Sequence, residues 1–173
     1  MKIVFPFLLA FLLVLHLTGK SQTRDTNQSE ETKTYQIPEG MIQKIEKSDA
    51  EWRNELGEDQ YKILRQCSTE PPFTGKYYKH KGEGVYVCAG CGQELFDSKT
   101  KYESGSGWPS FFAAVDKTKI TEIVDKTYGM QRTEIKCSKC DGHLGHVFSD
   151  GPAPTGLRYC VNSGAIDFVE KKK

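Results

Sequence analysis

One short stretch of the chain, Arg158-Tyr159-Cys160-Val161-Asn162-Ser163, combines a cation, a thiol and an amide at alternating positions. Side chains of a β-strand alternate between two faces, so Arg158, Cys160 and Asn162 share one face if this stretch is extended. A guanidinium near a thiol favours the thiolate, which is the nucleophilic form of cysteine. The pattern predicts a nucleophile at Cys160, while a buried strand cysteine without chemistry is the alternative that spacing alone leaves open.

Two imidazoles and a carboxylate precede this cysteine in the run HLGHVFSD. These groups can protonate and orient a molecule that the sulfur attacks. His146, Phe148 and Asp150 share one face if the run is extended, whereas His143 lies on the other face unless Gly145 bends the chain. A structural hydrogen-bonding role for either histidine is the competing interpretation.

Four of the six cysteines form two matched C-x-x-C pairs, with the spacing of zinc knuckles: Cys88, Cys91, Cys137 and Cys140. A glycine follows each pair closely, and we expect Gly92 and Gly142 to adopt the unusual dihedral angles that such turns need. Two turns of this kind supply four thiolates, the tetrahedral ligand set of structural zinc. Because four protein ligands leave no open position, we expect one zinc ion that stabilises the fold and takes no part in chemistry.

Disulfide bonds are the alternative use of these cysteines if the chain is exported. A bridge within one C-x-x-C pair is strained and easily reduced, which suits redox sites and not structural ones. We therefore predict zinc, and Cys67 and Cys160 remain as the two cysteines available for a redox cycle. Cys67 lies in a segment that Pro71 and Pro72 prevent from continuing as a helix.

Short helices and short strands are predicted around these residues. Ser48-Asp49-Ala50-Glu51 has the form of a capping box, so a helix should begin there and run to Leu56, stopped by Gly57. A second helix is expected from Glu58 to Gln66. Short strands between glycines are expected at 85–88, 95–96, 133–137, 146–148, 157–162 and 166–169. The 16 Gly, 8 Tyr and 9 Phe likewise favour a turn-rich β protein.

The composition limits which classes of protein this chain can belong to. The 173 residues suit one domain, and 37% hydrophobic with 27% charged residues indicate a soluble globular protein. The net charge of +1 gives no electrostatic case for nucleic acid or an anionic membrane as a partner.

The N-terminus carries an apolar run from Ile3 to Leu17 after the charged start Met1-Lys2. The run is shorter than the ~20 residues of a spanning helix, so residues 1–21 are predicted to be a secretory signal peptide or a retained anchor. We expect a disordered linker over 22–41, the folded domain over 42–170 and a basic tail over 171–173. The chain is then exported to the periplasm or another extracytoplasmic compartment, with membrane contact only through a retained anchor.

From residue 42 to residue 169 the chain closely resembles the B-type peptide-methionine (R)-S-oxide reductases. Besides the two zinc knuckles, the matching motifs are Arg65 with TEPPFTG at 69–75, GWPSF at 107–111, GMQR at 129–132, HLGHVF at 143–148, DGP at 150–152 and RYCVNS at 158–163. These motifs are specific and cover nearly all of the predicted domain.

This resemblance implies a mostly β fold of two antiparallel sheets in a tent-like arrangement, with short N-terminal helices. It implies thiol-dependent reduction of the R epimer of methionine sulfoxide, protein-bound or free, to methionine. It implies that Cys160 is the nucleophile and His146 the proton donor, surrounded by His143, Asp150, Arg158 and Asn162. It also implies that Trp108 and Phe148 hold the substrate methyl group, although core packing is the ordinary role of such a tryptophan.

One departure from the family pattern concerns the recycling of Cys160. Many members carry a second redox cysteine two residues before the tryptophan, and Ser106 stands there in this chain. We therefore predict that Cys67 resolves a sulfenic acid on Cys160 as a disulfide, which a thioredoxin-type reductant reduces. Direct recycling by an external thiol is the alternative. We expect a monomer.

Two functions from other classes compete with a reductase. A zinc-ribbon interaction module would use the metal centre without catalysis, and Cys160 would then be a core residue. A general dithiol–disulfide oxidoreductase would act on protein disulfides. Turnover of the R sulfoxide but not the S sulfoxide separates the reductase from both.

Overall fold

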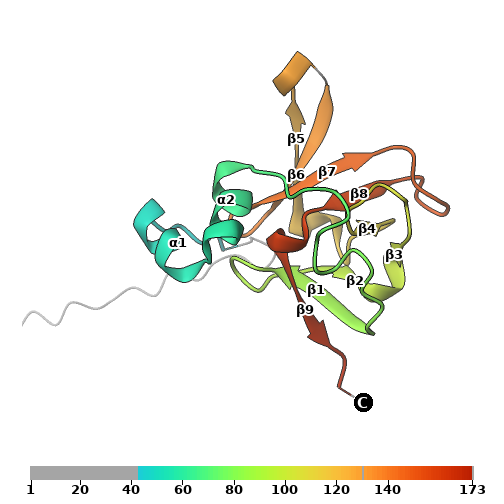
Figure 1. Ribbon diagram of the computed structural model, residues 1–173, viewed down its shortest axis with the longest axis horizontal. Helices are drawn as coiled ribbons and strands as arrows, with labels where there is room; N and C mark the ends of the chain where they lie inside the picture. The colour runs from blue at the N-terminus through green and yellow to red at the C-terminus, as the bar shows by residue number, and fades with distance from the viewer. Residues whose placement is uncertain (1–42, 130, 173) are drawn as a thin grey trace, which may run out of the picture. The chain divides into compact units, whose positions relative to one another are not determined.

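The computed structural model describes residues 43–129 and 131–172 of the chain (Figure 1). The predicted signal or anchor and the predicted linker lie outside these residues. Within the described ranges, no helix is long and apolar enough to cross a membrane.

Two short helices precede the strands in the described part of the chain. The helices are α1 (Asp49–Glu55) and α2 (Glu58–Gln66). The strands are β1 (Gly84–Cys88), β2 (Glu94–Asp97), β3 (Lys101–Tyr102), β4 (Ser110–Phe111), β5 (Ile120–Asp125), β6 (Arg132–Cys137), β7 (His143–Phe148), β8 (Arg158–Val161) and β9 (Ile166–Glu170). Single 3₁₀ turns separate some of them, namely η1 (Ser98–Thr100), η2 (Lys117–Lys119), η3 (Thr127–Gly129) and η4 (Ser163–Ala165).

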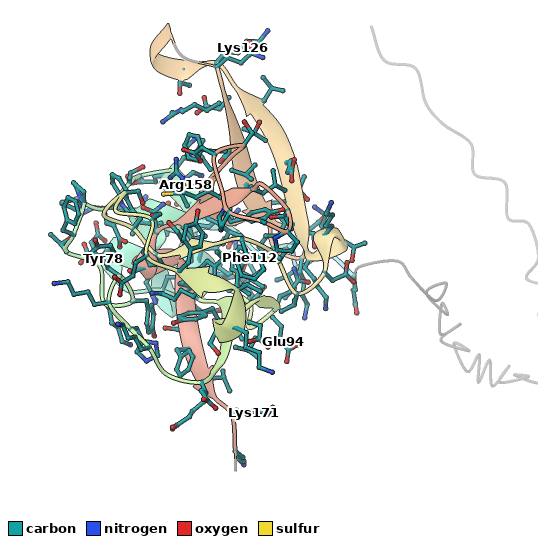
Figure 2. The ribbon with its side chains drawn as sticks, turned by 90° about the vertical axis from the view of Figure 1, so that its right-hand side faces the viewer. Tyr78, Glu94, Phe112, Lys126, Arg158 and Lys171 are labelled. Atoms are coloured by element: carbon teal, nitrogen blue, oxygen red, sulfur yellow. The ribbon has the colours of Figure 1, made fainter. Side chains whose placement is uncertain are left out.

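The strands form two antiparallel sheets, so the predicted fold class is confirmed. One sheet has the order β2-β1-β9 and the other has the order β3-β4-β8-β7-β6-β5. In Figure 1 the smaller sheet lies below the larger one, and the β5–β6 hairpin extends upward, away from the smaller sheet. Figure 2 shows Lys126 at the tip of this hairpin and Lys171 at the opposite end of the view.

The two helices agree with the sequence prediction because their end signals are local. Ser48 forms the capping box with Glu51 that starts α1, and a cap of this type stabilises a helix by about 1 kcal/mol. Gly57 is the N-cap of α2, which ends at Cys67 in a left-handed conformation with φ of 53°. Trp52 of α1 and the pair Tyr61 and Leu64 of α2 are buried.

The strands were predicted less completely than the helices. Six predicted strands are present as β1, β2, β6, β7, β8 and β9, with ends that differ by a few residues. The prediction missed β5, whose Ile123 and Val124 are 42% and 58% exposed and do not alternate with polar residues. It also missed β3 and β4, which are two residues long and carry no periodicity that sequence reasoning can detect.

An aromatic cluster joins the two sheets. Phe96 of β2 stacks on Phe111 of β4 with ring centroids 4.4 Å apart, and Tyr86 of β1 meets Phe111 edge-on at 5.0 Å. All three side chains have no exposed surface. Since β4 pairs with β8, this packing fixes the strand that carries Cys160 against the smaller sheet.

Candidate active site and metal centre

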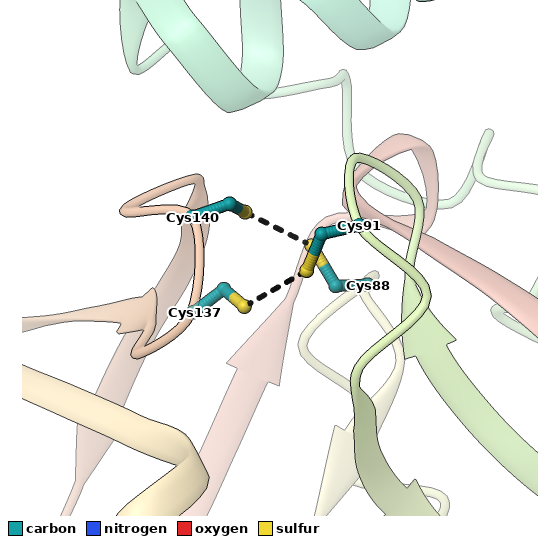
Figure 3. Close-up of side chains that lie close together, drawn as sticks. All are labelled: Cys88, Cys91, Cys137 and Cys140. Atoms are coloured by element: carbon teal, nitrogen blue, oxygen red, sulfur yellow. Dashed lines mark hydrogen bonds between the residues drawn. The ribbon is translucent and has the colours of Figure 1, made fainter. Parts of the chain in front are cut away.

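The four knuckle cysteines meet where the two sheets come together. Cys88 ends β1 and Cys137 ends β6, so each sheet contributes one knuckle (Figure 3). The Sγ atoms of Cys88 and Cys140 are 3.6 Å apart, those of Cys91 and Cys137 are 3.5 Å apart, and all four lie within 4.8 Å of one another. Sulfurs around tetrahedral zinc, at Zn–S distances of about 2.3 Å, are separated by about 3.8 Å. The four cysteines therefore fit a metal ion with four thiolate ligands.

The two knuckle turns use different residues for the left-handed position. Gly92 has φ of 70°, as predicted for the first knuckle. In the second knuckle the left-handed residue is Asp141, with φ of 56°, so the prediction for Gly142 was wrong. An added Cβ at Gly142 would lie 2.9 Å from Leu64 Cδ2. Gly142 thus allows Leu64 of α2 to pack closely, and the short polar side chain of Asp141 tolerates the left-handed turn.

Helix α2 ties the metal centre to the region around Cys67. The Arg65 guanidinium donates to the carbonyl of Cys140 at 2.8 Å, and its cation lies 4.9 Å from the Trp52 ring centroid. Cys67 follows as the C-cap of the same helix. A displaced second knuckle would therefore also displace the loop that carries Cys67.

Cys160 lies in the middle of the larger sheet, on β8. Its pairing partners are Ser110 on β4 and His146 on β7. Tyr159 and Val161 on either side are buried, while Cys160 and Arg158 are partly exposed, so the predicted alternation is confirmed within β8. Asn162 lies after the end of this strand and is buried, so it does not continue the alternation. The Ser106 hydroxyl lies 3.7 Å from the Cys160 sulfur. Cys160 therefore offers its thiol on the face that also holds Arg158 and Ser106.

Opposing effects set the ionisation of Cys160. Burial is the largest effect and raises the pKa of the thiol above its ordinary value. The Ser106 hydroxyl and the Arg158 guanidinium lower that pKa, while Asp150 raises it. Arg158 donates to Asp150 through Nε at 2.8 Å and Nη2 at 2.9 Å and lies over the Phe148 ring at 4.3 Å. The predicted guanidinium effect is present, but burial outweighs it in the free protein.

A bulge in β7 brings the two histidines together. The β6–β7 register shifts between Ile135 and Lys136, and the rings of His143 and His146 lie 5.7 Å apart. Gly145 has φ of 150°, and an added Cβ would lie 2.1 Å from the carbonyl oxygen of Cys160. Only glycine allows this approach of β7 to β8. The bend at Gly145 that the sequence left open is present.

Each histidine contacts a different acidic residue, and sequence analysis had singled out neither. His143 Nδ1 is 2.6 Å from Glu134 Oε1, and His146 Nε2 is 3.0 Å from Asp125 Oδ2. Hydrogen bonds from Thr127, followed by that from His146, hold the pKa of Asp125 below its usual range. Burial lowers the pKa of His143, so this imidazole is held in its neutral form.

The loop before β1 anchors Trp108 and Asn162. The Trp108 indole N–H donates to the carbonyl of Glu70 at 3.0 Å. The Asn162 amide accepts from the Glu70 N–H at 3.2 Å and donates to the carbonyl of Leu144 at 3.3 Å. The Glu70 carboxylate in turn accepts from the backbone of Ser163 and Gly164. Asn162 thus joins this loop to β7 and positions the end of β8.

Cys67 is exposed and points toward Glu134. Its thiol lies 3.7 Å from Glu134 Oε1, and burial, followed by the charge of Glu134, raises its pKa. All six cysteines lie in the described residues and all are free, so Cys67 and Cys160 are not joined by a disulfide.

A hollow of about 580 Å³ lies beside Cys160. Its lining includes Ser106, Arg158, Asp150 and Tyr102. Ser106 and Arg158 are also neighbours of the Cys160 thiol. Cys160 itself does not line the hollow, which adjoins the thiol only through these two neighbours.

Comparisons with known proteins agree with this arrangement. The family model described as "SelR domain" matches residues 56–170. A protein of Hahella chejuensis called "Peptide methionine sulfoxide reductase MsrB" is 60% identical over 127 residues, which are 73% of this chain and 91% of that protein. Proteins of Leptospira interrogans and Pseudomonas fluorescens with the same name are 58% and 55% identical over 131 residues, 76% of this chain and 100% of each relative.

Proposed function

The chain belongs to the MsrB family of peptide methionine sulfoxide reductases, and on this premise we propose that it reduces the R epimer of methionine sulfoxide through Cys160. The observation that carries this proposal is the position of Cys160 on β8, directly opposite His146 on β7, with Ser106 and Arg158 beside its sulfur. This pairing supports a nucleophile and a proton donor on adjacent strands.

The first chemical step consumes the sulfoxide. The Cys160 thiolate attacks the sulfoxide sulfur and forms a transient S–S bond, while the sulfoxide oxygen takes up a proton from His146. The resulting hydroxyl then moves to the Cys160 sulfur as this S–S bond breaks. The S–O bond to methionine breaks, and the oxygen remains on Cys160 as a sulfenic acid. Methionine leaves with its sulfur reduced, and Cys160 carries the two-electron oxidation.

The charge around Cys160 suits this step. In the free protein burial favours the neutral thiol, and Arg158 and Ser106 favour the thiolate. Because the effects oppose one another, a small change at Arg158 shifts the thiolate population.

The second step converts the sulfenic acid on Cys160 into a disulfide. The Cys67 thiol attacks the sulfenic sulfur, water leaves, and a Cys67–Cys160 disulfide forms. A thioredoxin-type dithiol then reduces this bond. The exposed position of Cys67 at the start of a Pro-containing loop supports this resolving role. The thiol must reach Cys160, and an external reductant must reach the disulfide.

Selection of the epimer is assigned to aromatic side chains. Trp108, held by Glu70, and Phe148, under Arg158, would contact the S-methyl group while the oxygen faces His146. His143 and Asn162 would position this arrangement through their contacts with Glu134 and Glu70. The four-cysteine centre would hold one zinc ion, which stabilises the fold and has no open position for substrate.

The wider setting is also proposed. The substrates are oxidised proteins or free methionine-R-sulfoxide, the protein acts as a monomer, and it works in the periplasm or another extracytoplasmic compartment after signal cleavage or anchoring. The apolar run Ile3–Leu17 supports the location. N-terminal sequencing of fractionated native protein checks it, and soluble cytosolic protein that begins at Met1 would contradict it.

The deciding experiment is an assay with resolved epimers and dithiothreitol as the reductant. Wild-type protein should convert the R epimer and leave the S epimer untouched, and Cys160→Ser should convert neither. A protein that binds zinc and turns over neither epimer would be an interaction module. Reduction of protein disulfides at a higher rate than R sulfoxide would indicate a general dithiol oxidoreductase.

A further inference from the structure

A second group of metal-binding side chains lies apart from the four-cysteine centre. It consists of Cys67 at the end of α2, Glu134 on β6 and His143 on β7. The thiol sulfur, a carboxylate oxygen and a ring nitrogen all lie within 4.8 Å of one another. Thiolate, carboxylate and imidazole are each common zinc ligands. Three protein ligands with water in the fourth position are a known zinc coordination.

Two hydrogen bonds converge on a single oxygen in this group. Glu134 Oε1 faces His143 Nδ1 at 2.6 Å and Cys67 Sγ at 3.7 Å. A carboxylate oxygen accepts, so the imidazole and the thiol both direct hydrogens toward it. A divalent ion between the three atoms would replace these two hydrogens with stronger contacts.

The ligands are held in place before a metal arrives. His143 is 2% exposed, and the side chain of Glu134 is 15% exposed. His143 Nε2 is buried and has no partner among the described residues, so the ring hydrogen can move to Nε2 without breaking another hydrogen bond. Cys67 is exposed and provides the path by which an ion enters.

The charges around the group select the type of ion. Lys136 Nζ lies 3.6 Å from Glu134 Oε2, and Arg65 also acts on Cys67. These cations disfavour ions held mainly by charge, such as Mg²⁺ or Ca²⁺, which prefer oxygen ligands. They disfavour Zn²⁺ or Co²⁺ less, because thiolate and imidazole bond such ions strongly.

We propose that Cys67, Glu134 and His143 form a second metal site of this protein, which takes one Zn²⁺ or Co²⁺ ion with water as the fourth ligand. Binding releases one proton, which comes from the Cys67 thiol, and moves the imidazole hydrogen from Nδ1 to Nε2. The site exists only while Cys67 is reduced. Its consequence for turnover rests on the proposed function: a metal-bound Cys67 cannot resolve the Cys160 sulfenic acid, so the ion inhibits recycling.

The test is an anaerobic titration with Co²⁺ of full-length protein whose four-cysteine centre is filled with zinc. Wild type should bind one further equivalent with a thiolate-to-cobalt absorption band, and no zinc should be released. Cys67→Ser should lose the band, and Glu134→Gln should weaken Co²⁺ binding by more than about tenfold. The matched control is Cys160→Ser, which removes the other free thiol and should keep the band. A wild type without the band, or a band that survives Cys67→Ser, would overturn the site.

A second arm separates this site from the resolving role of Cys67. Protein treated with one equivalent of R sulfoxide before the titration should lose the band, because Cys67 is then in a disulfide. If the treated protein keeps a Cys67-dependent band, the metal site stands and the resolving role of Cys67 is wrong. If untreated protein shows no band but Cys67→Ser still stops thioredoxin-driven turnover, the metal site fails and the resolving role stands.

Discussion

Two groups of cysteines in this protein have the same side chain and opposite surroundings. In the metal centre four sulfurs crowd within 4.8 Å of one another, and three of the four residues are buried. Cys67 and Cys160 instead have no other cysteine beside them, and each lies near polar or charged side chains that act on its pKa. A thiolate that is a metal ligand is not free to attack, whereas an isolated thiol can ionise and react. On this contrast in position rests our proposal that the four clustered cysteines hold the structure and the other two do the chemistry.

The largest expected effect comes from breaking the metal centre. Cys137→Ser should lose both the metal and cooperative unfolding, because a structural zinc site contributes about 10–16 kcal/mol to folding in small zinc-binding peptides. Metal analysis and thermal unfolding followed by circular dichroism measure this. Cys67→Ser is the matched control and should keep one metal and the wild-type transition. A stable, metal-free Cys137→Ser protein would show that the four clustered cysteines do not hold the fold through a metal.

Removal of the nucleophile should stop turnover and spare the fold. Cys160→Ser is expected to lower the dithiothreitol-driven rate on R sulfoxide by more than about a thousandfold, as removal of a covalent nucleophile does. Its metal content and unfolding transition should equal those of wild type. If Cys160→Ser keeps a substantial fraction of the activity, the assignment of Cys160 fails.

Loss of Cys67 should affect turnover differently with two reductants. Cys67→Ser should lose turnover driven by a thioredoxin-type protein, since no disulfide can form, but should still complete one round of sulfoxide reduction. Dithiothreitol should partly restore turnover by attacking the sulfenic acid directly. Equal rates with the thioredoxin-type reductant for wild type and Cys67→Ser would show that an external thiol recycles Cys160.

The smallest expected effect is a pair of opposite shifts in the pKa of Cys160. Arg158 lowers this pKa and Asp150 raises it, so Arg158→Gln should move the pH dependence of Cys160 alkylation upward and Asp150→Asn should move it downward. Alkylation requires the thiolate, so its rate rises with pH through the pKa. The rate of iodoacetamide labelling in a Cys67→Ser background measures the shift. Shifts of the same sign would show that structural change, and not charge, controls Cys160.

The helices, the four-cysteine cluster and the strand of Cys160 were predictable because their signals are local. A capping box, a C-x-x-C spacing and an alternating strand each depend on neighbours in the sequence. Whether the chain bends at Gly145 could not be predicted from the sequence, because the bend depends on how closely β8 approaches β7.

The partners of the reactive groups could not be predicted. Asp125 and Glu70 lie 21 and 93 residues from their partners, and Glu134 reaches His143 on the neighbouring strand. Isolated acidic residues carry no signal in the sequence of what they contact. Likewise, the left-handed position of Asp141 and the close approach of Leu64 to Gly142 depend on how α2 packs on the second knuckle. These features arise only when distant elements meet.

Peptide mapping after reaction with one equivalent of R sulfoxide, without reductant, tests the contrast between the two groups most directly. The account predicts a single disulfide, Cys67–Cys160, in protein that keeps its metal, while Cys88, Cys91, Cys137 and Cys140 stay reduced. A persistent sulfenic acid on Cys160 without the Cys67–Cys160 peptide would contradict the resolving step. A disulfide within either C-x-x-C pair, with release of the metal, would contradict the separation of structural from reactive cysteines.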